Sequence, residues 1–192
     1  MRKSVVAAPV AGLGAAALSY WLVVTGRATL DLGWGRRERA LGPFAIEVAA
    51  PAETVFDVVA EPYLGRSTRA LAEKLKVLER TPEMILAEHY TPAGAGMRAV
   101  TVETVVFERP HRVSFRLLRG PVPHVVEHFD LSEGDGVTTL TYSGELGTDF
   151  GAAGAWWGRV VAVRWERAVR ETFASVKDEA ERRERTGRAR EA

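Results

Sequence analysis

The 192-residue sequence contains no cysteine, which excludes disulfides, thiolate catalysis and zinc–thiolate sites. Charge of one sign is also lacking, because 26 lysines and arginines face 25 aspartates and glutamates and the formal net charge is +1. Such a balance gives no global attraction to nucleic acid or to acidic substrates. The hydrophobic fraction of 46% is typical of a globular protein. The sequence therefore predicts a folded domain with no nucleic-acid partner.

Histidines are few, and their spacing does not suggest a metal site. His124 and His128 share one face of a predicted strand, but four strand residues span about 13 Å, which is too far for both rings to bind one ion. His89 and His111 lie on two other predicted strands. The sequence also has no phosphate loop, nucleophile elbow or combination of base, orienting group and oxyanion donors. We therefore predict no metal and no cofactor.

Only one long uncharged run is present, at residues 4–24 (SVVAAPVAGLGAAALSYWLVV). A helix of that length reaches roughly 31 Å, enough to cross the hydrocarbon core of a bilayer. Arginines are more numerous after the run than before it, which favours a cytoplasmic C-terminal part. The sequence thus predicts a membrane anchor over residues 1–25, a juxtamembrane linker over 26–43, and a single-pass protein of the cell membrane.

Three other interpretations of this run stay open. A cleaved signal peptide is one, although WLVVTGRA is a poor cleavage site. A buried helix of a soluble domain is another. The stretch GLGAAA also resembles a dinucleotide-binding loop, but Pro9 interrupts the strand that should precede it and no acidic residue follows at the required distance.

The rest of the chain alternates between strand and helix patterns. Residues 44–49 read as a strand, and a short apolar helix begins at Pro51 and ends before Pro62, with a second short helix considered over 63–72. Strand patterns follow at 74–80, 84–90, 98–108, 111–119, 125–132 and 137–147, and a helical stripe covers 150–183 before a charged tail at 184–192. The antiparallel sheet must cover its apolar face, and only the last helix is long enough to do so.

Three stretches carry a family resemblance. They are IEVAAPAETVFDVVAEP at 46–62, VFERPHRVSFRL at 106–117 and EHFDLSEGDGVTTLTYSGEL at 127–146. On these, residues 44–183 resemble the SRPBCC or START-like superfamily, and within it the polyketide cyclase/dehydrase and lipid-transport group. The resemblance implies an α+β helix-grip fold, in which a curved antiparallel sheet of about six to seven strands wraps around the long C-terminal helix. The segment AEPYLGRSTRAL lacks the tryptophan that many relatives carry there.

A space between such a sheet and helix would be lined by the apolar face of each. The predicted ligand-binding cavity consists of Phe115, Leu117, Phe129, Leu140, Tyr142, Trp157, Val161 and Trp165. Filling of the core is the alternative explanation for the same residues. Tyr142 is the best-placed polar group of this set, and it is the one weak candidate for a catalytic role.

Three functions remain open from the sequence. The leading hypothesis is a membrane-anchored domain that binds an apolar small molecule or lipid without catalysis. The first alternative, implied by the resemblance, is an enzyme of the polyketide cyclase/aromatase type. The second is a non-enzymatic module that binds another protein and has a well-filled core. The sequence leaves the ligand and the oligomeric state open.

Overall fold

The computed structural model describes residues 7–65, 74–94 and 96–191. Helix α1 (Ala7–Val24) comes first and is followed by strand β1 (Arg37–Val48) and helix α2 (Ala52–Ala60). Six strands follow, and helix α4 closes the chain. They are β2 (Leu75–Arg80), β3 (Ile85–Gly94), β4 (Met97–Glu108), β5 (Arg112–Arg119), β6 (His124–Gly134), β7 (Val137–Thr148) and α4 (Gly151–Glu191).

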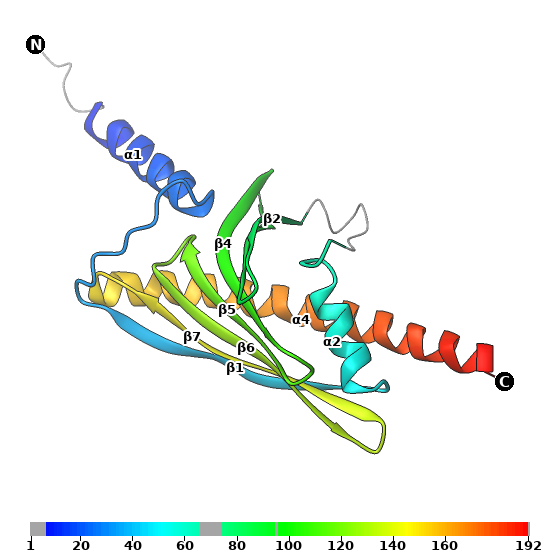
Figure 1. Cartoon of the computed structure of the whole chain (residues 1–192). Helices are drawn as coiled ribbons and strands as arrows, with labels where there is room; N and C mark the ends of the chain where they lie inside the picture. The colour runs from blue at the N-terminus through cyan, green and yellow to red at the C-terminus, as the bar shows by residue number, and fades with distance from the viewer. Residues whose placement is uncertain (1–6, 66–73, 95, 192) are drawn as a thin grey trace, which may run out of the picture.

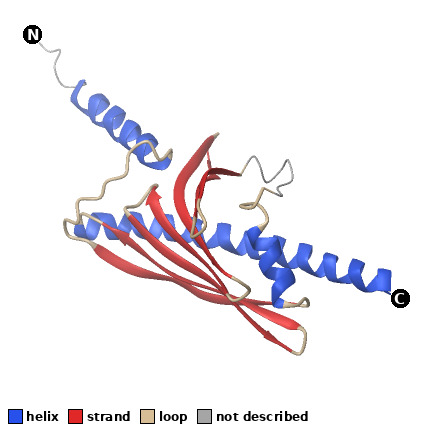
Figure 2. Cartoon of the chain, viewed as in Figure 1, coloured by secondary structure: helices blue, strands red, loops and turns tan. Residues whose placement is uncertain are grey.

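The strands form one curved antiparallel sheet of seven strands, in the order β1-β7-β6-β5-β4-β3-β2 (Figure 2). Strands β2 to β7 each pair with their neighbour in the chain, and β1 completes the sheet beside β7. Side chains alternate between the faces, so that in β6 Val125, Phe129 and Leu131 are buried on the inner face. The predicted combination of an antiparallel sheet and a long C-terminal helix is confirmed.

Helix α4 has 41 residues and runs along the sheet for its first half (Figure 1). At 1.5 Å per residue it is about 60 Å long. Its apolar stripe buries Val161, Phe173 and Val176 against the core, whereas Trp156 lies off the stripe and is exposed. Helix α2 packs across α4, and Arg183 binds both carboxylate oxygens of Glu61 at 2.7 Å, which ties the end of α2 to the long helix.

Strand β1 and helix α4 extend furthest beyond the predicted bounds. Strand β1 begins at Arg37 rather than at Phe44, and its added residues pair with β7 from Arg37–Thr148 to Leu41–Gly144. The register shifts between Leu41 and Phe44, which breaks the alternation that a strand should show in sequence. Helix α4 continues to Glu191, so that residues 184–191 of the predicted tail are helical. The second short helix considered over 63–72 lies largely outside the described residues.

The N-terminal run does form a helix, but the prediction of a membrane span is not supported. Helix α1 ends at Val24 as expected. Within the part of the chain that the structure describes, no helix is both long and apolar enough to cross a membrane. Residues 4–6 of the predicted span lie outside that part.

The segment between α1 and β1 packs closely against the start of α4. Asp149 accepts hydrogen bonds from the backbone N–H of Leu32 at 2.7 Å, from that of Gly33 at 2.9 Å, and from Arg36 Nε at 2.9 Å. The backbone N–H of Phe150 donates to the carbonyl of Trp34 at 2.7 Å. These bonds hold the end of α1 beside the sheet, where it contacts β4 (Figure 1).

Candidate functional site

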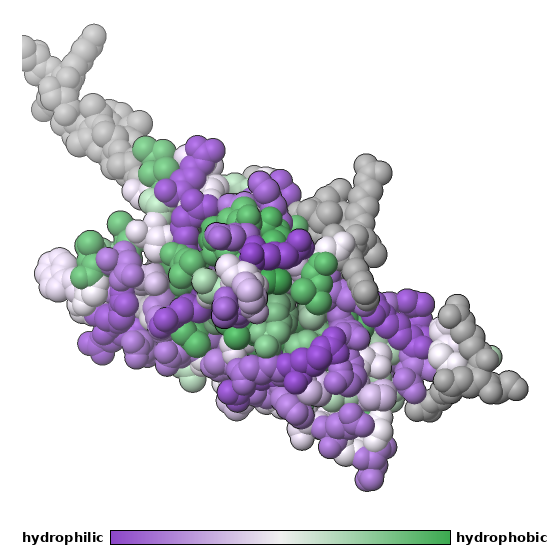
Figure 3. All heavy atoms as spheres, in the orientation of Figure 1, coloured by the Kyte–Doolittle hydropathy of each residue, from purple (hydrophilic) through white to green (hydrophobic). Residues whose placement is uncertain are grey.

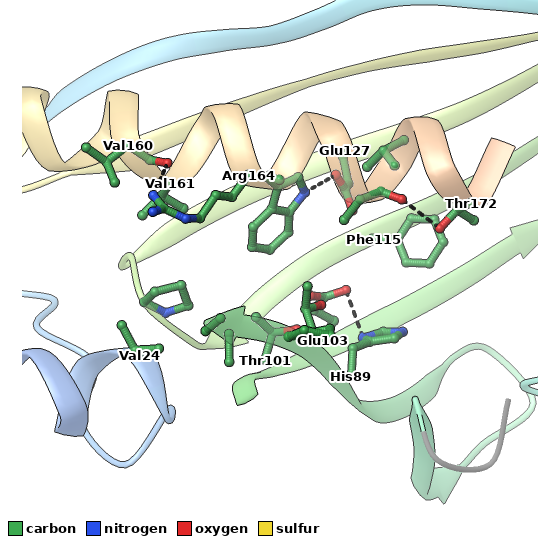
Figure 4. A pocket seen from close by; sticks show the side chains of 18 of the residues that line it. Val24, His89, Thr101, Glu103, Phe115, Glu127, Val160, Val161, Arg164 and Thr172 are labelled. Carbon is green, nitrogen blue, oxygen red and sulfur yellow. Dashed lines mark hydrogen bonds and ion pairs between the residues drawn. The ribbon is translucent and has the colours of Figure 1, made fainter. Parts of the chain in front are cut away.

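A cavity of about 220 Å³ lies between the inner face of the sheet, helix α4 and the end of α1. Its walls are mostly apolar and aromatic, and Figure 3 shows hydrophobic residues gathered in the middle of this side of the molecule. The close view in Figure 4 shows polar side chains on both sides of the space, with Glu127 near α4 and Glu103 and His89 across from it. A cavity of this kind, apolar with a few convergent polar groups, is typical of a small-molecule site.

Five of the eight predicted cavity residues line this space. They are Phe115, Phe129, Trp157, Val161 and Trp165. Leu117, Leu140 and Tyr142 are buried in the surrounding core and do not line it. The structure thus places five of the eight predicted residues around one cavity, whereas contact of these residues with a ligand stays a prediction.

Glu127 is the polar centre of one half of the cavity. Its position in β6 falls on the inner face between Val125 and Phe129, so strand alternation turns the carboxylate inward. The Tyr142 hydroxyl donates to Glu127 Oε2 at 2.8 Å, and Trp165 Nε1 donates to the same oxygen at 2.7 Å. Oε1 receives no hydrogen bond from any residue that the structure describes. This second oxygen is therefore available to a ligand.

The backbone opposite Glu127 makes room for this arrangement. Gly144 of β7 pairs with Glu127. A Cβ atom at Gly144 would lie 2.6 Å from the carbonyl oxygen of Val126 and 2.9 Å from Glu127 Cβ. Such contacts are too short for any residue larger than glycine without movement of the strand. The close approach of β6 and β7 at the carboxylate therefore depends on this glycine.

The environment of Glu127 favours its protonated form. Burial, together with the nearby charge of Glu103, raises the pKa of Glu127 to about 7, while the hydrogen bonds from Trp165 and Tyr142 act in the opposite direction. Burial also raises the pKa of the Tyr142 hydroxyl, so this group stays protonated and serves as a donor. At neutral pH, Glu127 can both accept and donate a proton, which suits general acid–base chemistry.

The other half of the cavity holds a charged pair. His89 Nδ1 lies 3.2 Å from Glu103 Oε2, which is an ion-pair distance without hydrogen-bond geometry. Burial is the largest single effect and lowers the pKa of His89, but the charge of Glu103, its close contact with the ring and the charge of Glu127 together outweigh burial, so the net shift is upward. Burial is likewise the largest single effect on Glu103 and opposes its ionisation, but the attraction of His89 and a hydrogen bond from Thr101 together outweigh burial, so that the pKa of Glu103 is lowered. The pair therefore favours an imidazolium beside a carboxylate.

A tyrosine completes this second group. The Tyr63 hydroxyl lies 2.9 Å from His89 Nε2. Burial raises the pKa of Tyr63, which keeps the hydroxyl protonated. Strand β5 separates the two groups, so the backbones of β4 and β6 lie about 10 Å apart. A ligand between them would meet a titrating carboxyl on one side and the Tyr63–His89–Glu103 group on the other.

Sequence reasoning missed most of this polar site. Glu103, Glu127 and His89 were not singled out from the sequence, and no acid–base combination was found there, whereas the structure places these three side chains around one cavity. The sequence nevertheless indicates that Glu127 is buried, because side chains alternate along a strand and Glu127 falls on the same face as Phe129 and Leu131. A charged residue on the buried parity of an amphipathic strand is costly unless it has partners, and this makes it a functional candidate.

A curved sheet that grips a long helix over a mostly apolar cavity defines a helix-grip protein. The chain belongs to the polyketide cyclase / dehydrase and lipid transport family, whose pattern matches residues 44–181, well over half of its length. This confirms the resemblance seen in the sequence. No curated protein shows detectable sequence similarity to it.

Solved structures share the fold at low sequence identity. The Zhui aromatase/cyclase from Streptomyces sp. R1128 has a TM-score of 0.62 and 20% identity, over 77% of this chain and 95% of that one. The di-domain ARO/CYC BexL from the BE-7585A biosynthetic pathway has a TM-score of 0.62 and 21% identity, over 77% and 50%. Norcoclaurine synthase from Thalictrum flavum has a TM-score of 0.52 and 16% identity, over 76% and 94%. At these identities the likenesses show the fold alone.

Proposed function

We propose that the protein is an acid–base enzyme of the cyclase/dehydrase type, which binds an apolar small molecule with a carbonyl group and transfers a proton on it. The observation that carries the proposal is Glu127, a buried carboxyl with a pKa near 7 and an oxygen free for a ligand. Family membership and the aromatase/cyclases among the structural neighbours support this class of reaction. We therefore favour an enzyme over the non-catalytic carrier, which was the leading hypothesis from the sequence.

The two polar groups divide the reaction between them. Glu127 Oε1 removes the proton from a carbon next to the carbonyl, and the electron pair of that C–H bond moves to the carbonyl oxygen as an enolate. The positive charge of the His89 imidazolium, whose ring nitrogens lie against Glu103 and Tyr63, stabilises the developing negative charge from the opposite side. Protonated Glu127 then returns the proton to carbon, or to a hydroxyl that leaves as water in a dehydration. Tyr142 and Trp165 orient the carboxyl and do not touch the reacting atoms.

A non-catalytic carrier of apolar molecules is the second candidate, and the aromatic walls of the cavity favour it. Phe115, Phe129 and Trp157 offer a flat ligand large apolar surfaces, whose burial contributes about 25 cal/mol per Å². The cavity argues against the third function, a protein-binding module with a filled core. Neither candidate needs a membrane anchor, and the anchor forms no part of the proposal.

Deuterium exchange into 2-tetralone tests the proposal. This bicyclic aryl ketone exchanges its α-protons when a base forms the enolate, and NMR in D₂O follows the loss of signal. We expect the full-length protein to accelerate the exchange, with a rate that rises with pH through about 7 as Glu127 ionises. Glu127→Gln should lower the acceleration at least about 100-fold, because the general base is lost.

The control is Glu145→Gln, which makes the same change at an exposed glutamate on the outer face of the sheet. It should leave the exchange rate unchanged. If 2-tetralone binds and the natural protein does not accelerate its exchange, the result favours the non-catalytic carrier and contradicts the enzyme. Equal acceleration by Glu127→Gln and the natural protein would remove Glu127 from the mechanism.

A further inference from the structure

A second cavity, of about 340 Å³, lies beside the first at the end of α1. Its walls come from α1 with Tyr20 and Val23, from the following segment with Leu30, and from the start of α4 with Phe150, Ala153 and Trp157. Tyr20, Val23 and Leu30 lie outside residues 44–181 that match the family. This cavity is therefore built partly by a segment that the family pattern does not include.

The two cavities share one wall. Tyr20, Pro121 and Trp157 line both of them. Trp157 is fixed, because its Nε1 donates to the carbonyl of Pro121 at 2.8 Å. Tyr20 meets Trp157 edge to face, with 6.0 Å between ring centroids, and is 41% exposed. A single ring pair of this kind contributes only about 0.5–1.5 kcal/mol, so the contact of Tyr20 with Trp157 is a weak part of the shared wall.

The chemistry of the second cavity differs from that of the first. Among the wall residues that the structure describes, Asp149 is the one that carries a charge, and it is bound to Arg36 and to the backbone N–H groups of Leu32 and Gly33. The hydrogen bond from Arg36 lowers the pKa of Asp149, so the group stays ionised in that role. The remaining wall residues offer mainly hydrocarbon and aromatic surface. This cavity suits an uncharged apolar group rather than a second reacting centre.

We infer that the second cavity is the tail subsite of the ligand whose carbonyl group lies at Glu127. The ligand is then an elongated molecule, with a carbonyl-bearing head between Glu127 and His89 and an uncharged alkyl tail that passes Tyr20 and Trp157. The inference rests on the proposed function, because it takes the head group from that site. The shared wall supports one ligand in both spaces rather than two independent ligands.

A homologous series of 2-alkanones from 8 to 12 carbons tests the inference, with Kd measured by equilibrium dialysis on the full-length protein. Each added methylene that enters an apolar site tightens binding about fourfold. We expect this gain to continue along the whole series in the natural protein. Ala153→Trp fills the second cavity and should abolish the gain for the longest ketones, while 2-octanone binds as before.

Two further variants keep the test decisive. Ala152→Trp places the same ring on the exposed side of α4, away from both cavities, and should keep the full gain. Val23→Phe fills the same cavity from α1 and should reproduce the loss if Ala153→Trp does not fold. A gain that persists in both filled variants overturns the inference. If 2-octanone binds and longer chains add nothing in the natural protein, the tail subsite is wrong and the proposed function stands. If no alkanone binds at any length, the tail subsite is wrong, and the exchange of 2-tetralone decides the proposed function separately.

Discussion

Glu103 and Glu127 are two buried glutamates in one cavity, and they have opposite acidities. Each is 5% exposed, and each faces inward from a neighbouring part of the same sheet. Burial opposes ionisation of both, yet the pKa of Glu103 is lowered and that of Glu127 is raised to about 7. The difference lies in their partners, because Glu103 faces a cationic imidazole whereas Glu127 receives two neutral donors.

This comparison shows that burial alone does not decide the role of a carboxyl group. A nearby cation keeps Glu103 ionised, and Glu103 in turn keeps His89 protonated. Neutral donors orient Glu127 without holding it ionised, so it can exchange its proton near neutral pH. One cavity thereby combines an ion pair with a titrating group.

The largest effect should come from removal of the cation. His89→Gln leaves the Glu103 carboxylate buried without a counter-charge, and loss of one member of a buried ion pair typically costs about 3–5 kcal/mol. Glu127→Gln should cost much less, because Tyr142 and Trp165 can donate to the amide oxygen. Urea unfolding at pH 7 measures both variants. Similar losses in the two variants would contradict the contrast between the glutamates.

The pH dependence of stability provides the second test. Glu127 has a raised pKa of about 7 in the folded protein against 4.5 as its ordinary value, so its contribution is fully present below pH 4.5 and is lost as the pH rises through 7. One pKa unit corresponds to about 1.4 kcal/mol, so the contribution lost by pH 7 is about 3 kcal/mol.

Urea unfolding of the natural protein and of Glu127→Gln, between pH 4.5 and 8, isolates this contribution. The other groups are common to both proteins and cancel in the difference. Stability of the natural protein should fall relative to the variant as the pH rises. A constant difference across the range would mean that Glu127 has an ordinary pKa.

A smaller effect should follow from Gly144→Ala, which disturbs Glu127 and leaves Glu103 in place. The added methyl group meets the backbone of Val126 and forces β6 and β7 apart, at a typical cost of about 1–3 kcal/mol. Ketone exchange should fall as well, because Glu127 moves with its strand. Gly134→Ala is the matched control, since nothing lies within 4 Å of its added carbon. Unchanged exchange in Gly144→Ala would show that the glycine does not position the carboxyl.

Much of the fold was predictable from the sequence, because strand alternation and helical spacing are local patterns. The strands from β2 to β7 and the stripe of α4 follow directly from them. The start of β1 was not predictable, because the register shift between Leu41 and Phe44 interrupts the period of two. The N-terminal run shows the limit of composition, since length and lack of charge indicated a helix but did not establish a membrane span.

The candidate site was predictable in part. The aromatic walls at Phe115, Phe129 and Trp165 follow from the apolar face of each element. The two buried glutamates belong to no recognised sequence motif. Glu127 and Glu103 come together only through the order of strands in the sheet. Their distance in sequence hides the arrangement. The parity of each glutamate, taken strand by strand, would have shown that both face inward.

The hydrogen bonds between Asp149 and the segment before β1 have a practical consequence for the choice of an expression boundary. A shortened chain that starts at residue 44, where the family match begins, would lose Leu32, Gly33 and Arg36 and leave the Asp149 carboxylate, only 3% exposed, without these partners. It would also lose the first seven residues of β1 and one wall of each cavity. The shortest chain that preserves the site is therefore longer than the family match over residues 44–181. A protein cut to that match would lack part of the walls of both cavities.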